Sequence, residues 1–185
     1  MIFRNRNVML LSYCRASFST SQAIFLALFS IYAVEKLGIK ESTLALLFTI
    51  RGFSNTLSRF PAGRISDRIG RRIPMLVSYG LLVVSFTIIA FYESITMLGI
   101  ALVLYGLCWG TRAVSEWAFL TDLVEPNIKT LSISYLSSVF GFGSTLGSIA
   151  SGWLATIFPY STLFLLGAVL NLGTIPAILA MKKRE

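Results

Sequence analysis

The chain has 185 residues, of which 55% are hydrophobic and 13% are charged, and its formal net charge is +8. A soluble domain carries roughly a quarter of its residues as charged side chains, so this composition favours a membrane protein. The sequence has no histidine, and Cys14 and Cys108 lie in apolar segments without CxxC spacing. We therefore expect no metal site, no disulfide framework and no cofactor.

Six apolar segments follow one another along the chain, separated by short polar joints such as 35–41 and 61–72. Each segment is long enough to cross a hydrocarbon core of about 30 Å as a helix. The first follows basic residues, as a signal peptide would, but it is too long for a signal-peptide core and has no convincing cleavage site. We therefore predict an all-α membrane protein, with residues 1–185 as one domain. The predicted helices are 8–34, 42–60, 73–91, 96–121, 131–157 and 162–181.

Most basic residues fall at one end of the predicted helix zigzag, and only Lys36 and Lys40 fall at the other. This asymmetry is the positive-inside pattern, which predicts a multi-pass inner-membrane protein with both termini cytoplasmic. The net charge then reflects membrane topology, and nucleic acid is not an expected partner. The clustered basic residues are Arg4, Arg6, Arg64, Arg68, Arg71, Arg72, Lys129, Lys182, Lys183 and Arg184.

The predicted helices differ in polarity. The third and sixth carry no charge within the span, so we expect them to face lipid on the outside of the bundle. The first, second and fourth carry charges at membrane depth and the fifth is rich in glycine and serine, so we expect these four to be interior. Each group of three helices ends in its most apolar member, and Thr56–Gly63 weakly resembles Thr145–Gly152. This pattern predicts two inverted three-helix repeats.

The joint between the second and third helices carries the most specific pattern in the chain, from Gly63 to Arg72. It reads Gly-Arg-Ile-Ser-Asp-Arg-Ile-Gly-Arg-Arg. A tight antiparallel connection needs Gly70 for the turn, and Gly63 allows helices to approach closely. The alternative is an ordinary basic loop, but the segment resembles the signature G-x-x-x-D-R-x-G-R-R of the major facilitator superfamily at every fixed position. The resemblance implies one six-helix half of a transporter fold.

In that family the loop acid, matched here by Asp67, joins a charge network with a loop arginine, matched by Arg71. An acid at the cytoplasmic end of the fourth helix completes the network and is matched by Asp122. The resemblance implies that these residues latch one state of an alternating-access cycle and do not contact substrate. The full set of expected latch residues is Gly63, Asp67, Arg68, Gly70, Arg71, Arg72 and Asp122.

The fifth helix contains a segment similar to the family's antiporter motif, but Ser148 and Ser151 replace its proline and one glycine. A generic close-packing role for Gly143, Gly147 and Gly152 is therefore the favoured interpretation. Drug–proton antiporters of this family typically have an arginine four residues before a glycine in the fourth helix of their N-terminal half. In this chain Gly106 stands at that position, four residues before Gly110. This replacement, the abrupt start and the tail 182–185 favour a C-terminal half.

Charged side chains at membrane depth are the candidates for a substrate path, since each costs about 2.5–3.5 kcal/mol to insert. On the first helix a polar stripe is formed by residues at spacings of three and four, namely Ser12, Arg15, Ser19 and Gln22. This spacing places them on one face, which we expect to line water. Arg112 and Glu116 can pair on the fourth helix, and Glu116 is the only obvious proton carrier. Alternatively, that pair only neutralises itself, and Arg15 and Arg51 bond backbone carbonyls or snorkel. The candidates are Arg15, Ser19, Gln22, Arg51, Arg112 and Glu116.

The expected function is secondary active transport of a small organic solute by alternating access. Three buried arginines against one acid favour an anionic solute, with drug–proton efflux as the alternative. An intramembrane enzyme is disfavoured because the chain lacks histidine and its aspartates lie at cytoplasmic helix ends. A central cavity needs a second six-helix bundle, from a homodimer or a separately encoded half. A non-transporting or truncated regulatory module is the remaining alternative.

Overall fold

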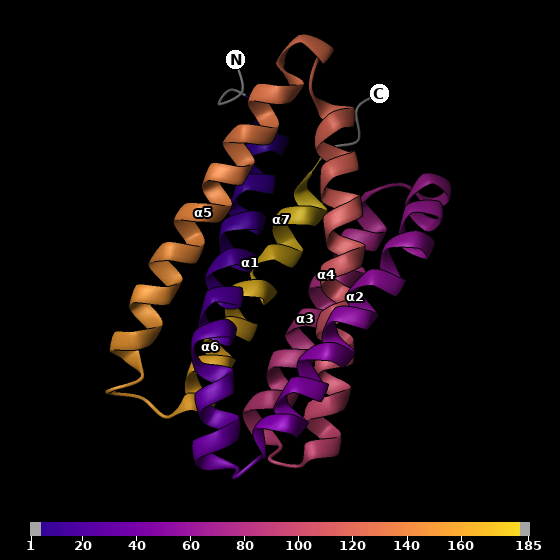
Figure 1. Ribbon diagram of the computed structural model, residues 1–185. Coiled ribbons are helices and arrows are strands. Elements are labelled where there is room, and N and C mark those ends of the chain that lie inside the picture. Colours follow the sequence, from indigo (N-terminus) through magenta and orange to yellow (C-terminus); the bar gives the residue numbers. More distant parts are fainter. Residues whose placement is uncertain (1–4, 182–185) are drawn as a thin grey trace.

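The structure is a computed structural model that describes residues 5–181, and every regular element in that range is a helix (Figure 1). Arg4, Lys182, Lys183 and Arg184, which contribute to the predicted charge asymmetry, lie outside the described residues. The predicted all-α class is confirmed. The elements are α1 Arg6–Ile31, the π-helix η2 Tyr32–Lys36, α2 Glu41–Ile69, α3 Arg72–Phe91, α4 Ile95–Leu123, the 3₁₀-helix η3 Pro126–Ile128, α5 Lys129–Leu154, α6 Tyr160–Leu172 and α7 Thr174–Ala180.

The sixth predicted helix is divided into α6 and α7 at Gly173. Pro176 has no backbone N–H to donate to the carbonyl of Leu172, and its ring crowds that carbonyl, so the α-helical ladder is interrupted there. Counting α6 and α7 as one rod, the described chain has the six helical rods that the sequence predicts. Their antiparallel arrangement follows from the short connections between them.

Four of these rods have the length and apolar composition of a membrane span: Arg6–Lys36, Arg72–Phe91, Ile95–Leu123 and Tyr160–Ala180. The other two, α2 and α5, have 29 and 26 residues, which is long enough at about 1.5 Å per residue. However, α2 carries several arginines and α5 many serines. The count of six spans therefore stays a prediction.

The predicted end of the second helix at residue 60 is wrong, because α2 continues to Ile69. Pro61 lies inside the helix, where its missing N–H removes one backbone hydrogen bond without ending the rod. The expected polar joint is reduced to Gly70 and Arg71. Gly70 has a φ of 91°, a left-handed conformation that glycine adopts without a steric penalty. Asp67 and Arg68 therefore lie in the last turn of a helix.

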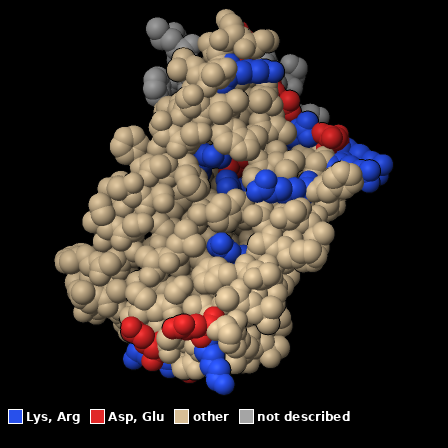
Figure 2. All heavy atoms as spheres, viewed as in Figure 1, with Lys and Arg blue, Asp and Glu red and all other residues tan. Residues whose placement is uncertain are grey.

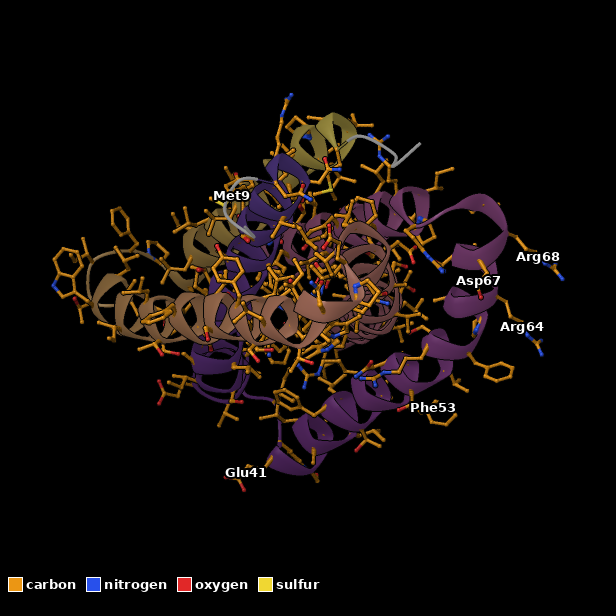
Figure 3. The ribbon with its side chains drawn as sticks, turned by 90° about the horizontal axis from the view of Figure 1, so that it is seen from above. Met9, Glu41, Phe53, Arg64, Asp67 and Arg68 are labelled. Atoms are coloured by element: carbon orange, nitrogen blue, oxygen red, sulfur yellow. The ribbon has the colours of Figure 1, made fainter. Side chains whose placement is uncertain are left out.

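Within the described residues, α1 and α4 form the interior of the bundle. Helix α1 packs mainly against α5 and α6, and α4 packs mainly against α2 and α3. Helix α3 also packs against α6 and so closes the back of the bundle (Figures 1 and 3). On the opposite face α5 and α2 flank α1 and α4 (Figure 1).

The expectation that α2 and α5 are interior is wrong for this chain, because both are largely exposed. Each buries only a narrow stripe of mostly small residues against its neighbour. The exposed surface carries large apolar side chains together with arginines on α2 and serines on α5. On α2 the buried residues are Leu47, Ser54, Ser58, Ala62 and Ser66, and on α5 they are Ser132, Leu136, Gly143, Gly147 and Ser151.

Two glycine pairs allow this close packing. A Cβ atom on Gly147 would lie 2.9 Å from the Cα of Thr20 on α1, and Gly143 faces α1 in the same way. On α4, a Cβ atom on Gly106 would lie 2.8 Å from the Cβ of Ser54, and Gly110 also approaches the α2 backbone. This second pair was not among the glycines expected to pack closely, although its four-residue spacing is a known signal of close helix contact.

Two glycines expected at close contacts do not lie at them. A Cβ atom on Gly152 would meet nothing within 4 Å, because five residues of helix rotate it away from the face that carries Gly147. At Gly63 the nearest atom is the Val114 Cγ1, 3.8 Å away, which is an ordinary van der Waals distance. Both predictions of close helix approach are wrong within the described chain.

Candidate functional site: an arginine cluster in the middle of the bundle

A buried ion cluster joins three helices at the centre of the bundle. Glu116 on α4 accepts from Arg15 Nη1 of α1 at 3.0 Å on its Oε2 atom, and from Arg112 on the same oxygen. The Tyr79 hydroxyl of α3 lies 2.6 Å from Glu116 Oε1. Glu116 is only 1% exposed, Arg112 3% and Arg15 7%. The predicted pairing of Arg112 with Glu116 is therefore present, and Arg15 joins it.

The same arginines are also held by a backbone carbonyl and by aromatic rings. Arg15 Nε donates to the carbonyl of Leu136 on α5 at 3.0 Å, and its guanidinium lies 4.3 Å from the ring centroid of Trp117. The Arg112 guanidinium lies 3.7 Å from the ring centroid of Phe18. Such cation–π contacts stabilise a desolvated guanidinium by about 2 kcal/mol. The cluster therefore fixes α1, α3, α4 and α5 relative to one another.

The cluster carries more positive than negative charge. Arg15 and Arg112 share the single carboxylate of Glu116, which leaves one positive charge over. The Nε atom of Arg112 is buried and has no hydrogen-bond partner among the described residues. A surplus cation in an apolar environment is costly unless an anion reaches it. The site therefore favours an incoming anionic group.

A cavity of about 340 Å³ opens beside this cluster. Arg59 of α2 contributes a third guanidinium to its wall, and its Nε atom lies 3.3 Å from Asn55 Oδ1. Arg59 was not among the residues expected at the site, although it follows Arg51 and Asn55 on α2 at successive spacings of four, which was a usable signal. Figure 2 shows basic groups in hollows in the middle of the face that α2 and α5 flank. The cavity is lined by Arg15, Arg59, Trp109, Arg112, Ala113, Val114, Trp117 and Phe140.

Two other candidates on α1 lie away from that cavity lining. Ser19 is fully buried where Gly143 approaches, and its hydroxyl donates to the carbonyl of Ala16 at 3.0 Å. Gln22 is 7% exposed, and its Oε1 atom has no hydrogen-bond donor among the described residues. The structure therefore brings Arg15, Arg112 and Glu116 together, but not the whole α1 stripe.

Arg51 has a different environment, because aromatic side chains of three helices surround it. Its guanidinium carbon lies between 5.2 and 5.7 Å from the ring centroids of Phe25, Phe48, Tyr105 and Trp109. The Nη1 atom is buried without a hydrogen-bond partner in residues 5–181. Arg51 is thus placed among rings and not on a backbone carbonyl.

At the end of the bundle where α2 turns into α3, Arg71 bridges two helices. Its Nε atom donates to Asp122 Oδ2 of α4 at 3.1 Å, and its Nη1 atom pairs with Asp67. The hydrogen bond with Asp67 is the largest contribution that raises the pKa of Arg71 above its usual value. The structure therefore brings together Asp67, Arg71 and Asp122, the three of the seven expected latch residues for which the family resemblance implies a charge network.

The other arginines of the Gly63–Arg72 segment do not take part in this bridge. Arg72 Nη2 donates to the carbonyl of Ile178 at 3.1 Å and also to that of Leu179, which ties the turn to the end of α7. Arg64 and Arg68 project outward from α2, as Figure 3 shows. Both side chains are exposed at that end of the bundle, and the Arg64 guanidinium lies 4.6 Å from the ring centroid of Phe60.

The fold, the α2–α3 turn and the central cluster together define a class of membrane transport protein. The family model described as Major Facilitator Superfamily matches residues 11–185, so the chain belongs to that superfamily. This confirms the resemblance that the Gly63–Arg72 segment indicated.

Relatives with known sequences and structures agree with this assignment. The chain is 28% identical over 136 residues to an uncharacterized MFS-type transporter, YfkF, of Bacillus subtilis (strain 168), covering 74% of this chain and 34% of that protein. It is 30% identical over 112 residues to the class B tetracycline resistance protein of Escherichia coli, covering 60% of this chain and 27% of that protein. A crystal structure of a D-xylose–proton symporter superposes with a TM-score of 0.81 at 13% identity.

That superposition covers 96% of this chain and 48% of the symporter chain. The chain thus spans about half of the solved transporter, and the matched region about a third of the first curated relative. The chain is therefore a fragment of the fold that these proteins have.

Proposed function

We propose that this chain is one wall of a secondary active transporter that moves a small organic anion by alternating access. The observation that carries the proposal is the cavity lined by Arg15, Arg59 and Arg112 together with Trp109, Trp117 and Phe140. Guanidinium groups bind carboxylates, sulfonates and phosphates, and aromatic rings bind the apolar part of an organic molecule. One carboxylate, Glu116, neutralises only part of the positive charge.

A second six-helix bundle would form the opposite wall of the cavity. The face flanked by α2 and α5 supports this, because basic groups lie in hollows in its middle, and charged side chains at membrane depth face a cavity or a partner and not lipid. Helices α2 and α5 also expose large apolar side chains, which suit contact with lipid or with the second bundle. The second bundle would be another copy of this chain or a separately encoded half. The exposed residues include Phe53, Leu57, Phe60, Phe142, Leu146 and Ile149.

The turn between α2 and α3 would act as the conformational latch of this transporter. Arg71 holds Asp67 and Asp122 together across the ends of α2 and α4, and all three side chains are at least partly exposed. Exposed ion pairs of this kind are worth about 0–1 kcal/mol, so they can break and reform during a transport cycle. The latch would lie on the cytoplasmic side of the inner membrane.

The two groups of three helices would be inverted repeats. Exchanging α1–α3 with α4–α6 converts the contact of α1 with α5 into the contact of α4 with α2, and both contacts are extensive. The same exchange relates the contact of α4 with α3 to that of α1 with α6. Inverted repeats place the substrate site near the middle of the membrane, where the arginine cavity lies.

Drug efflux is the second candidate function, and the similarity to the class B tetracycline resistance protein supports it. The arginine cavity distinguishes an organic anion from a cationic drug. An organic anion needs the arginine cavity, whereas a cationic drug would be repelled by its surplus positive charge. Ligand charge therefore separates the two proposals.

A ligand-dependent stability measurement tests the proposed function. Protein extracted with its native lipid and any co-purifying bundle would be heated with benzoate, benzamide or benzylamine at equal concentrations. We expect benzoate to raise the midpoint of unfolding, because a ligand that binds only the folded state stabilises it. Arg59→Gln should reduce this shift, whereas Arg64→Gln, on the same helix but projecting outward, should keep it in full. Stabilisation by benzylamine alone would contradict the proposal and favour cationic drugs.

A further inference from the structure

Arg51 and Tyr105 lie together in an aromatic cage, formed by Phe25, Phe48, Tyr105 and Trp109, on the side of the arginine cavity nearer the start of α2 and α4. Both carry a buried donor. Arg51 Nη1 and the Tyr105 hydroxyl are each buried without a hydrogen-bond partner in the described chain. The guanidinium carbon of Arg51 lies 5.4 Å from the ring centroid of Tyr105, whose side chain is 1% exposed. Leaving buried donors unpaired destabilises a fold, and the cost is larger for a charged group.

No carboxylate in residues 5–181 compensates this guanidinium. The ion pairs of the described chain involve Arg15, Arg71 and Arg112, and none includes Arg51. The faces of the four rings around Arg51 stabilise the cation, and the Tyr105 hydroxyl also lies close to it, but none of these groups carries a negative charge. An oxyanion would supply the counter-charge that this cage lacks.

The cage and the arginine cavity are neighbours that share one side chain, Trp109. Trp109 lines the cavity, and its ring centroid is 5.7 Å from the Arg51 guanidinium. On α4, Tyr105 precedes Arg112 by about two helical turns, or about 10 Å along the axis. Arg51 is itself partly exposed on the α2 side, so the cage can be reached from the open face of the bundle.

We infer that Arg51 and Tyr105 form a second binding position for an organic oxyanion, separated from the arginine cavity by the indole of Trp109. The carboxylate, sulfonate or phosphate of the solute accepts from Arg51 Nη1 and from the Tyr105 hydroxyl. Its apolar part packs against the surrounding rings. The inference rests on the proposed function and deepens it, because it gives the transported anion two successive positions along the path.

Counting bound anions tests this inference separately from the proposed function. The probe is radioiodinated 4-iodobenzoate, measured by equilibrium dialysis against the protein in native lipid with any bundle that co-purifies. We expect two sites per chain in the unaltered protein. Arg51→Gln should leave one site, and Tyr105→Phe should weaken binding at the second site by about tenfold or more. Neutral 4-iodobenzamide should not bind in this saturable manner.

Matched variants assign each site. Arg59→Gln should remove the site in the arginine cavity and keep the one at Arg51, whereas Arg64→Gln should keep both. Since Tyr105→Phe removes only a hydroxyl, it serves where Arg51→Gln fails to fold. A single site in the unaltered protein that Arg59→Gln abolishes would overturn this inference and leave the proposed function standing. Two sites that survive both Arg51→Gln and Tyr105→Phe would also overturn it. No binding at all would contradict the proposed function as well.

Discussion

Arg15 and Glu116 lie 3.0 Å apart in the centre of the bundle although 101 positions separate them in the chain. The contact joins α1 to α4, the two helices that form the interior. Because both side chains are less than 10% exposed, their pairing is a condition for burying either of them. The central ion cluster is therefore both a structural tie and the charged wall of the cavity.

Replacing Glu116 with Gln should strongly destabilise the protein. The change leaves Arg15 and Arg112 buried without a counter-ion, and breaking a buried pair in this way typically costs about 3–5 kcal/mol. Thermal unfolding in detergent should therefore show a large decrease in the midpoint. Glu93→Gln is the matched control, since Glu93 is exposed. Equal midpoints for the two variants would show that the buried pair does not hold α1 and α4 together.

Replacing Tyr79 with Phe should weaken the cluster more mildly. The change removes the hydroxyl 2.6 Å from Glu116 Oε1 and keeps the fully buried ring. A hydrogen bond to a charged group contributes about 1.5–3 kcal/mol. The unfolding midpoint of Tyr79→Phe should lie between those of the unaltered protein and Glu116→Gln. A midpoint equal to that of the unaltered protein would mean that the hydroxyl is dispensable.

Adding a methyl group to the close-packed glycines should separate the helices. We expect Gly147→Ala on α5 and Gly106→Ala on α4 each to cost about 1–3 kcal/mol, because the new Cβ atom would overlap neighbouring backbone or Cβ atoms. Gly152→Ala, which faces open space, should leave stability nearly unchanged. Chemical denaturation of the three variants checks this order. A loss of unfolding free energy in Gly152→Ala as large as that in Gly147→Ala would contradict the close packing of α5 on α1 at Gly147.

Removing the bridge between α2 and α4 should change conformational exchange more than stability. Arg71→Gln loses both Asp67 and Asp122, but pairs this exposed contribute only about 0–1 kcal/mol. We expect faster amide hydrogen exchange in residues 63–72 and at the end of α4, with a nearly unchanged unfolding midpoint. The Arg68 side chain projects outward, so the amide hydrogens of Arg68→Gln should exchange at the same rates as those of the unaltered protein. Unchanged exchange in Arg71→Gln would exclude a latch role for this bridge.

The sequence predicted the helical rods and the family, because apolar segment length and the Gly63–Arg72 pattern are local signals. It placed the pairing of Arg112 with Glu116 correctly, since the two residues are one helical turn apart. It could not place Arg15 on the same carboxylate or Tyr79 on its other oxygen, because those contacts depend on how separate helices pack.

The errors at α2 and α5 have a similar cause. Polar residues at membrane depth suggested an interior position, but a narrow stripe of small residues is enough to attach each helix to the bundle. The sequence predicted a polar joint from residue 61 because the apolar segment ends there, whereas α2 continues through Pro61 to Ile69. Helical continuation there depends on neighbouring turns and not on the proline alone.

The central claim is that this bundle works with a second one across the basic cavity. The most direct test is the mass of the particle extracted into native lipid discs without crosslinking. One chain has a mass of 20.4 kDa. The account predicts a particle with two six-helix bundles, either two copies of this chain or one copy with a distinct six-helix partner. A particle that contains a single copy and no other six-helix bundle would contradict it.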